Sequence, residues 1–175
     1  LIFVSESSEH ERYRQLCRSL SEALKFLDSI SAQPVAELRR VDFFTSHESL
    51  HLAYERALIR QSVRDGLWYN LSTHLPWIGE RTRALDEAHV EMARGIENPL
   101  GVKIGPSATA EQIIDLVRVL NPTNKPGRVS LIHRMGKDKV TELLHELVES
   151  VQRSGLNVLW ICDPMHANTV TATTG

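Results

Sequence analysis

From about Thr73 onward, short apolar segments alternate with amphipathic segments of helical period, and this alternation constrains the fold more than any other feature of the chain. Apolar runs of this length predict four strands, at His74–Gly79, Leu100–Ile104, Arg128–Arg134 and Asn157–Asp163. Between them the sequence predicts three helices, at Asp86–Arg94, Thr109–Leu120 and Lys137–Ser154. Strand–helix–strand units at a regular interval favour parallel strands joined by right-handed crossovers. An antiparallel sandwich would give hairpin turns, and we identify none.

The predicted helix ends carry recognisable signals. Thr109 and Gln112 have the spacing of a capping box, in which a threonine side chain and a glutamine side chain satisfy each other's backbone N–H groups. Gly95 and Gly155 stand where a left-handed residue commonly ends a helix. The last helix has one continuous apolar stripe, formed by Val140, Leu143, Leu144, Leu147, Val148 and Val151.

Residues 1–72 are expected to form a helical region outside or flanking this pattern, and residues 73–175 consecutive β/α units of one larger domain. A first helix has its apolar face at Tyr13, Leu16, Leu20, Leu24 and Leu27. A second helix is predicted to begin near Thr45, because Thr45 and Glu48 have capping-box spacing. Its expected apolar face consists of Leu50, Tyr54, Ala57 and Leu58.

Composition and charge exclude several classes of protein. The net charge of −2 and a pI near 6.5 give no reason to expect nucleic acid or an anionic membrane surface as a partner. No apolar run is long enough to span a bilayer. Cys17 and Cys162 lie far apart without metal or redox spacing, which favours a reducing, cytosolic setting. Because the chain begins without methionine and stops just after a predicted strand, we expect it to be part of a larger protein.

Four parallel strands suit either a doubly wound sheet or part of a (β/α)8 barrel. No glycine-rich phosphate fingerprint follows the first strand, which weakens the dinucleotide-binding option. We therefore favour an α/β fold that is part of a TIM barrel.

Charged residues gather where the predicted strands end. In a barrel these carboxyl ends form one face, on which active sites are built from several strands. The residues at or near these ends are Glu80, Arg81, Lys103, Arg134, Asp163 and His166.

Lys103 is the strongest single candidate for a residue that binds a ligand. Alternation along its strand places Leu100, Val102 and Ile104 on one face and Lys103, between glycines, on the other. Burial of an unpaired ammonium is costly, so a partner anion is implied. We expect a ligand to supply that anion; a structural ion pair with a carboxylate of the barrel stays open as the alternative.

Arg81 and Arg134 suit bidentate binding of a carboxylate or phosphate, and together with Lys103 they could neutralise a ligand with two anionic groups. The alternatives are a solvated helix-start residue for Arg81 and a surface loop residue for Arg134. Imidazole is the commonest metal ligand, which makes His166 a candidate, but a lone histidine is more often structural.

Several motifs resemble the type II 3-deoxy-D-arabino-heptulosonate 7-phosphate synthases, in that family's order and spacing. The earlier segment SHESLHLAYERAL (Ser46–Leu58) also resembles the family's helical region ahead of the barrel strands. The motifs are WIGERTR (Trp77–Arg83), NPLGVKIGPS (Asn98–Ser107), NPTNKPGR (Asn121–Arg128), HRMG (His133–Gly136) and WICDPMH (Trp160–His166).

The resemblance implies a (β/α)8 barrel that condenses phosphoenolpyruvate with erythrose 4-phosphate, with a divalent metal, Mn²⁺ or Co²⁺, as cofactor. It implies that phosphoenolpyruvate is held by Glu80, Arg81, Lys103 and Arg134, and that His166 is a metal ligand. Lys103 and Glu80 are the expected catalytic residues, with Glu80 orienting water or managing a proton. The resemblance also implies an aromatic amino-acid feedback ligand, a homo-oligomer, and a location in the bacterial cytoplasm or the plant plastid.

Two departures from the family pattern stand out. The DPMH motif is usually followed by glycine, whereas here Ala167 follows. The family's other metal ligands, a cysteine before this segment and carboxylates after it, are absent, so we expect the 175-residue chain alone to be inactive. A paralogue serving a specialised, phenazine-like pathway and a non-catalytic barrel that binds phosphometabolites are the alternative functions.

Overall fold

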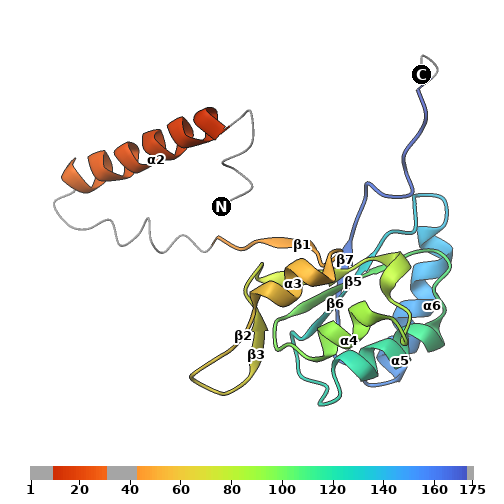
Figure 1. Ribbon diagram of the computed structural model, residues 1–175. Coiled ribbons are helices and arrows are strands. Elements are labelled where there is room, and N and C mark those ends of the chain that lie inside the picture. Colours follow the sequence, from red (N-terminus) through yellow and green to blue (C-terminus); the bar gives the residue numbers. More distant parts are fainter. Residues whose placement is uncertain (1–9, 31–42, 173–175) are drawn as a thin grey trace. The chain divides into compact units, whose positions relative to one another are not determined.

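The chain from Phe44 onward contains a five-stranded sheet in which every neighbouring pair of strands is parallel (Figure 1). The computed structural model describes residues 10–30 and 43–172. The strands lie in the order of the sequence: β1 (Ser46–Glu48), β4 (Leu75–Ile78), β5 (Leu100–Ile104), β6 (Val129–His133) and β7 (Leu159–Cys162). Four of the five strands and their parallel arrangement confirm the prediction from the sequence.

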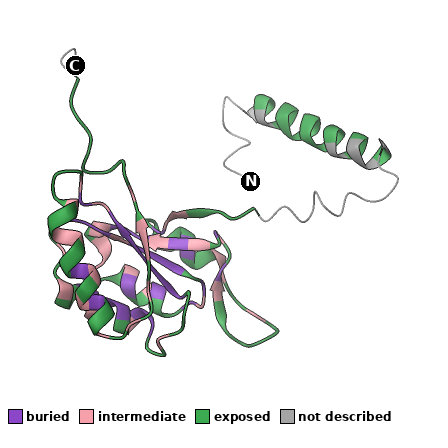
Figure 2. Ribbon diagram, turned by 180° about the vertical axis from the view of Figure 1, so that it is seen from behind, coloured by how far each residue is buried: buried purple, intermediate pink, exposed green. Residues whose placement is uncertain are grey.

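Three helices cover one face of this sheet and enclose the core (Figures 1 and 2). They are α4 (Ala88–Arg94), α5 (Ala110–Leu120) and α6 (Val140–Arg153), and all three were predicted. The core consists of apolar side chains that point from the strands toward the helices and from the helices toward the strands; it includes Val102, Ile104, Leu131, Ile113, Leu116, Leu120, Leu147 and Val151.

The predicted signals at helix ends are confirmed at two of three places. Thr109 and Gln112 form the capping box at the start of α5. Gly155 follows α6 with φ of +72°, in the left-handed region that suits glycine. Gly95 instead has φ of −83°, because its N–H continues the right-handed turn by bonding to carbonyls within α4, so the prediction of a left-handed residue there was wrong.

The segment from Thr45 differs from the prediction. Ser46–Glu48 is strand β1 rather than the first turn of a helix, because these residues pair with Leu75–Trp77 of β4. The helix α3 (Leu52–Leu58) begins later, after His51. Its expected apolar face is also wrong: Leu50 and Tyr54 are exposed. The buried α3 side chain is the carboxylate of Glu55.

A hairpin of β2 (Ile59–Gln61) and β3 (Trp68–Asn70) follows α3, where the sequence analysis identified no hairpin. Its connection contains Asp65-Gly66, and Gly66 has φ of +73°. An Asp-Gly pair between short strands is a strong hairpin signal, so the sequence did carry this information.

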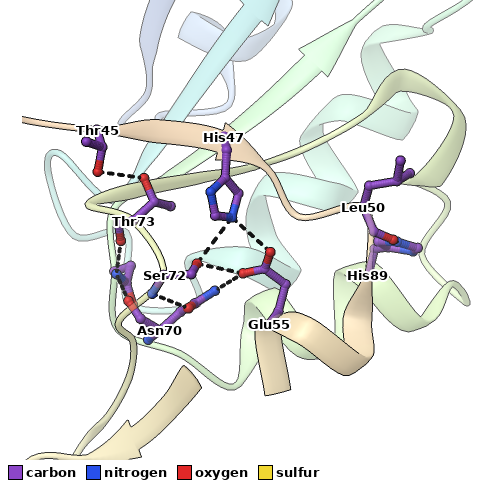
Figure 3. A network of polar contacts seen from close by, with 9 residues as sticks. Thr45, His47, Leu50, Glu55, Asn70, Ser72, Thr73 and His89 are labelled. Carbon is purple, nitrogen blue, oxygen red and sulfur yellow. Dashed lines mark hydrogen bonds and ion pairs between the residues drawn. The ribbon is translucent and has the colours of Figure 1, made fainter. Parts of the chain in front are cut away.

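A buried polar network ties β1 to α3 and to the segment before β4 (Figure 3). The Glu55 carboxylate accepts hydrogen bonds from the Asn70 amide and the Ser72 hydroxyl and lies 2.8 Å from His47 Nε2. The Asn98 side chain accepts from the Asn70 N–H and donates to the Asn70 carbonyl. The network therefore adds side-chain hydrogen bonds to the backbone pairing that holds the edge strand β1 against β4.

Two compact units divide the chain, Leu1–Phe43 and Phe44–Gly175. In the first, α2 (His10–Ile30) confirms the first predicted helix, with Leu16 and Leu20 of its expected apolar face more than half exposed. Residues 1–9 and 31–42 of the expected helical region lie outside the described residues. No helix in the described ranges has both the length and the apolar character needed to cross a membrane.

Candidate functional site

A pocket of about 260 Å³ lies where the parallel strands end. The carboxyl ends of adjacent parallel strands meet at one edge of a sheet, so side chains that follow different strands come together there. All five residues that the sequence analysis assigned to a site line this pocket, and three further residues complete it. The lining is Glu48, Trp77, Gly79, Glu80, Arg81, Lys103, Arg134 and His166.

Lys103 lies on the face of β5 opposite the core, as alternation predicted, since Val102 and Ile104 are fully buried against the helices. Its ammonium forms an ion pair with Asp163, at the end of β7, and lies 4.9 Å from the centre of the Trp77 ring. A protein carboxylate therefore pairs with this ammonium, where we expected a ligand to supply the anion. The ion pair named as the alternative is present because a lysine side chain reaches across β6 to the end of β7.

Asp163 accepts four hydrogen bonds and is only 9% exposed. Oδ2 receives the Lys103 ammonium and faces Nδ1 of His166 at 2.7 Å, while Oδ1 receives the backbone N–H groups of Met165 and His166. Burial raises the pKa of this carboxyl, but the hydrogen bonds from Lys103, the two N–H groups and the His166 ring outweigh burial and hold the pKa well below its usual value. Asp163 is therefore a carboxylate at neutral pH.

His166 is 59% exposed and directs Nδ1 toward Asp163. With Nδ1 bound to an acceptor, Nε2 is the ring nitrogen available to a metal, so the residue fits the role of a single imidazole ligand. Within residues 10–30 and 43–172, no group of three or more histidine, cysteine or carboxylate side chains is placed to hold a metal ion. The described part of the chain thus offers one ligand rather than a complete metal site.

Arg81 and Arg134 provide positive charge in the pocket that no carboxylate among the described residues neutralises. Neither guanidinium forms an ion pair within the described residues, and Nε of Arg134 is buried without a hydrogen-bond partner. A buried donor without a partner is costly, and planar guanidinium groups bind carboxylate and phosphate well. The pocket is therefore suited to an anion.

Glu80 is held by four donors. Arg83 donates from Nε and Nη2 at 3.1 and 3.0 Å, the Gly105 N–H binds Oε2, and the Ser107 hydroxyl lies 3.2 Å from Oε1. Each carboxylate oxygen thus has two partners, and Glu80 anchors the loop that follows β5. The sequence analysis did not identify Arg83 as this partner.

Three glycines make room for the pocket side chains. A Cβ on Gly101 would lie 2.7 Å from Cβ of Trp77, and one on Gly105 would lie 2.9 Å from the Glu80 carboxylate carbon. A Cβ on Gly79 would collide with the Glu48 carboxylate. The glycines on either side of Lys103 therefore make room for Trp77 and Glu80.

Glu48 and Trp77 line the pocket but were not predicted. Glu48 was missed because β1 was read as a helix; a strand there places Glu48 at a carboxyl end. Trp77 could have been found, because alternation along β4 buries Pro76 and Ile78 and turns Trp77 to the face of Lys103.

Comparisons with known proteins agree with this geometry. The profile of the Class-II DAHP synthetase family matches residues 1–175. A phospho-2-dehydro-3-deoxyheptonate aldolase of Streptomyces coelicolor (strain ATCC BAA-471 / A3(2) / M145) is 50% identical over 173 residues, which cover 99% of this chain and 38% of that protein. A probable chloroplastic phospho-2-dehydro-3-deoxyheptonate aldolase of Catharanthus roseus is 44% identical over 178 residues, covering 100% of this chain and 36% of that protein.

The chain thus spans well under half the length of the curated relatives it matches. The matched share nevertheless includes every residue that lines the pocket, since the family profile extends over the whole chain. The chain belongs to the Class-II DAHP synthetase family.

Proposed function

We propose that the full-length protein condenses phosphoenolpyruvate with D-erythrose 4-phosphate and water to give 3-deoxy-D-arabino-heptulosonate 7-phosphate and phosphate. This is the first step of the shikimate pathway to chorismate and the aromatic amino acids. Membership of the family and the names of the two relatives support this activity. The observation that carries it is the pocket in which Arg81 and Arg134 lack carboxylate partners within the described residues.

The proposal includes the fold of the whole protein. The five parallel strands, in sequence order with helices on one face, are compatible with part of a (β/α)8 barrel, and the position of the pocket at their carboxyl ends agrees with barrel enzymes. The remaining strands would come from the part of the relatives that this chain does not cover.

Arg81, Arg134 and Lys103 would bind the carboxylate and phosphate of phosphoenolpyruvate. Cations aimed at the phosphate also stabilise the charge that develops as it leaves. Lys103 has three N–H donors, so it can remain paired with Asp163 and still donate to the ligand. Glu80 would line the wall of the phosphoenolpyruvate site. Its carboxylate contacts Gly105 and Ser107 and so fixes the loop beside the substrate.

A divalent metal, Mn²⁺ or Co²⁺, would polarise the aldehyde of the second substrate when bound. His166 would supply one ligand through Nε2, and the other ligands would come from the rest of the protein. The contribution of the described residues is to hold that imidazole and the anionic substrate on the same rim.

The test is phosphate release by the full-length enzyme, which should require both substrates and a divalent metal. Arg134→Met should raise the dissociation constant of phosphoenolpyruvate at least tenfold, because a lost charge-assisted hydrogen bond is worth about 2 kcal/mol. Arg118→Met, on the exposed face of α5, is the matched control and should change neither quantity. Tight phosphoenolpyruvate binding without turnover by wild type would instead indicate a non-catalytic barrel.

A further inference from the structure

Among the described residues, Asp163 is the one carboxylate that contacts both Lys103 and His166, and the roles proposed above do not account for it. Oδ2 takes the Lys103 ammonium and lies 2.7 Å from His166 Nδ1. Oδ1 takes the Met165 and His166 N–H groups at 3.1 and 3.2 Å. Both oxygens have two partners, so the carboxylate cannot turn without losing several hydrogen bonds at once.

We propose that Asp163 is a positioning residue that sets the tautomer of His166 and the direction of Lys103 through a single carboxylate oxygen. The inference rests on the proposed function, since it assigns a purpose to the metal ligand and the substrate lysine of that site. Asp163 acts through these two side chains.

The tautomer follows from the chemistry of the contact. A carboxylate only accepts hydrogen bonds, so Nδ1 of His166 must carry the proton that lies between the two groups. A neutral imidazole with its proton on Nδ1 has its lone pair on Nε2. Asp163 therefore holds the ring in the one neutral form that can bind a metal through Nε2.

The same oxygen determines where the lysine charge lies. Lys103 is 14% exposed and would have no protein carboxylate within the described residues if Asp163 were lost. The ion pair keeps the ammonium beside Trp77, at 4.9 Å from the ring centre, and on the rim that Arg134 and His166 also line. The pair thus orients the lysine before an anionic ligand arrives.

The experiment compares full-length wild type with Asp163→Asn, which keeps the shape and one acceptor oxygen but removes the charge. Nitrogen-15 NMR of metal-free protein labelled at histidine should show the Nδ1–H tautomer for His166 in wild type and a mixture in the variant. The dissociation constant of Co²⁺ should rise ten- to hundredfold, the usual effect of losing such a partner. Asp163→Glu should recover part of the affinity.

Asp138→Asn is the matched control, because Asp138 is exposed in the neighbouring loop after β6. It should alter neither the tautomer nor Co²⁺ binding, and circular dichroism should confirm that both variants are folded. An Nε2–H tautomer in wild type, or unchanged tautomer and Co²⁺ affinity in folded Asp163→Asn, would overturn the inference. If the proposed function were wrong instead, the wild-type enzyme would fail to turn over its substrates, while the tautomer of His166 would still depend on Asp163.

Discussion

Lys103 shows how one contact changes what a substitution should do. Without a partner, its loss would relieve repulsion among three cations; with Asp163 paired to it, the loss leaves a buried carboxylate without its cation. We predict that Lys103→Met lowers the free energy of unfolding of the full-length protein by about 2 kcal/mol and weakens phosphoenolpyruvate binding at least tenfold. Chemical denaturation and ligand titration measure the two effects separately.

The control for Lys103→Met is Lys137→Met, since Lys137 is exposed in the loop after β6 and its side chain can be removed without breaking a buried pair. That variant should match wild type in both experiments. Normal phosphoenolpyruvate affinity in a destabilised Lys103→Met protein would restrict Lys103 to a structural role.

Ala167, directly after His166, has φ of +63°. A residue with a Cβ is strained there by about 1 kcal/mol, and the DPMH motif of the family usually continues with glycine. We predict that Ala167→Gly leaves the free energy of unfolding unchanged or raises it by up to about 1 kcal/mol, because relief of strain offsets the greater freedom of the unfolded chain.

Ala110→Gly in the first turn of α5 is the comparison for Ala167→Gly and should lose about 0.5–1 kcal/mol, since glycine is unfavourable in a helix. Denaturation midpoints of the two variants should therefore move apart. If Ala167→Gly lowered the free energy of unfolding as much as Ala110→Gly, the backbone at Ala167 would not be strained.

At the scale of elements, the short strand β1 is held both by its pairing with β4 and by a buried network of polar side chains. Glu55 of α3, 2% exposed, joins it to the segment before β4 through His47, Asn70 and Ser72 (Figure 3). Burial raises the pKa of Glu55, but the bonds from Asn70, Ser72 and His47 outweigh burial, and the net pKa is lowered. A lowered pKa means that the ionised form stabilises the fold above the unfolded pKa, and that this stability is lost as the pH falls.

We predict that Glu55→Gln lowers the free energy of unfolding by about 2 kcal/mol at pH 7, because a charged acceptor is replaced by a neutral amide with two donors of its own. The difference from wild type should shrink below pH 4.5, as the wild-type carboxylate itself becomes protonated. Urea denaturation at several pH values measures it, with the exposed Glu146→Gln of α6 as control. A difference that is independent of pH would argue against an ionised Glu55.

Elements with a strong apolar pattern could be predicted from the sequence, and those held by tertiary contacts could not. The stripe of α6 and the alternation of β5 determine which residues face the core, so both appear where expected. Ser46–Glu48 has no apolar pattern, and only its pairing with β4 makes it a strand. Likewise, the parallel arrangement of the strands is enough to bring Arg81 and Arg134 to one pocket. The Lys103–Asp163 contact depends in addition on the reach of a side chain across β6.

At the scale of the whole molecule, the position of the pocket at the strand ends explains why most of its residues could be predicted from the sequence. Each strand from β4 to β7 contributes residues at or just past its carboxyl end, while the opposite end of the sheet is stabilised by different means. There the buried Arg128 guanidinium donates to the carbonyls of Ala93, Ile96, Asn98 and Leu120, which include the C-terminal ends of α4 and α5. One end of the sheet therefore carries the proposed ligand pocket, and side-chain hydrogen bonds stabilise the other end.

The order of the strands has a consequence for how the sheet assembles. Because β1, β4, β5, β6 and β7 are neighbours in the same order along the chain and across the sheet, each new strand adds to an existing edge. On a ribosome, β5 can pair with β4 as soon as it emerges, and β6 with β5, without waiting for distant sequence. The growing edge is always a strand with unpaired backbone groups, which is the state most prone to wrong pairing with another chain. During synthesis, pairing of the next strand with the exposed edge therefore competes with pairing of that edge with another chain, until each β/α unit covers the edge left by the one before it.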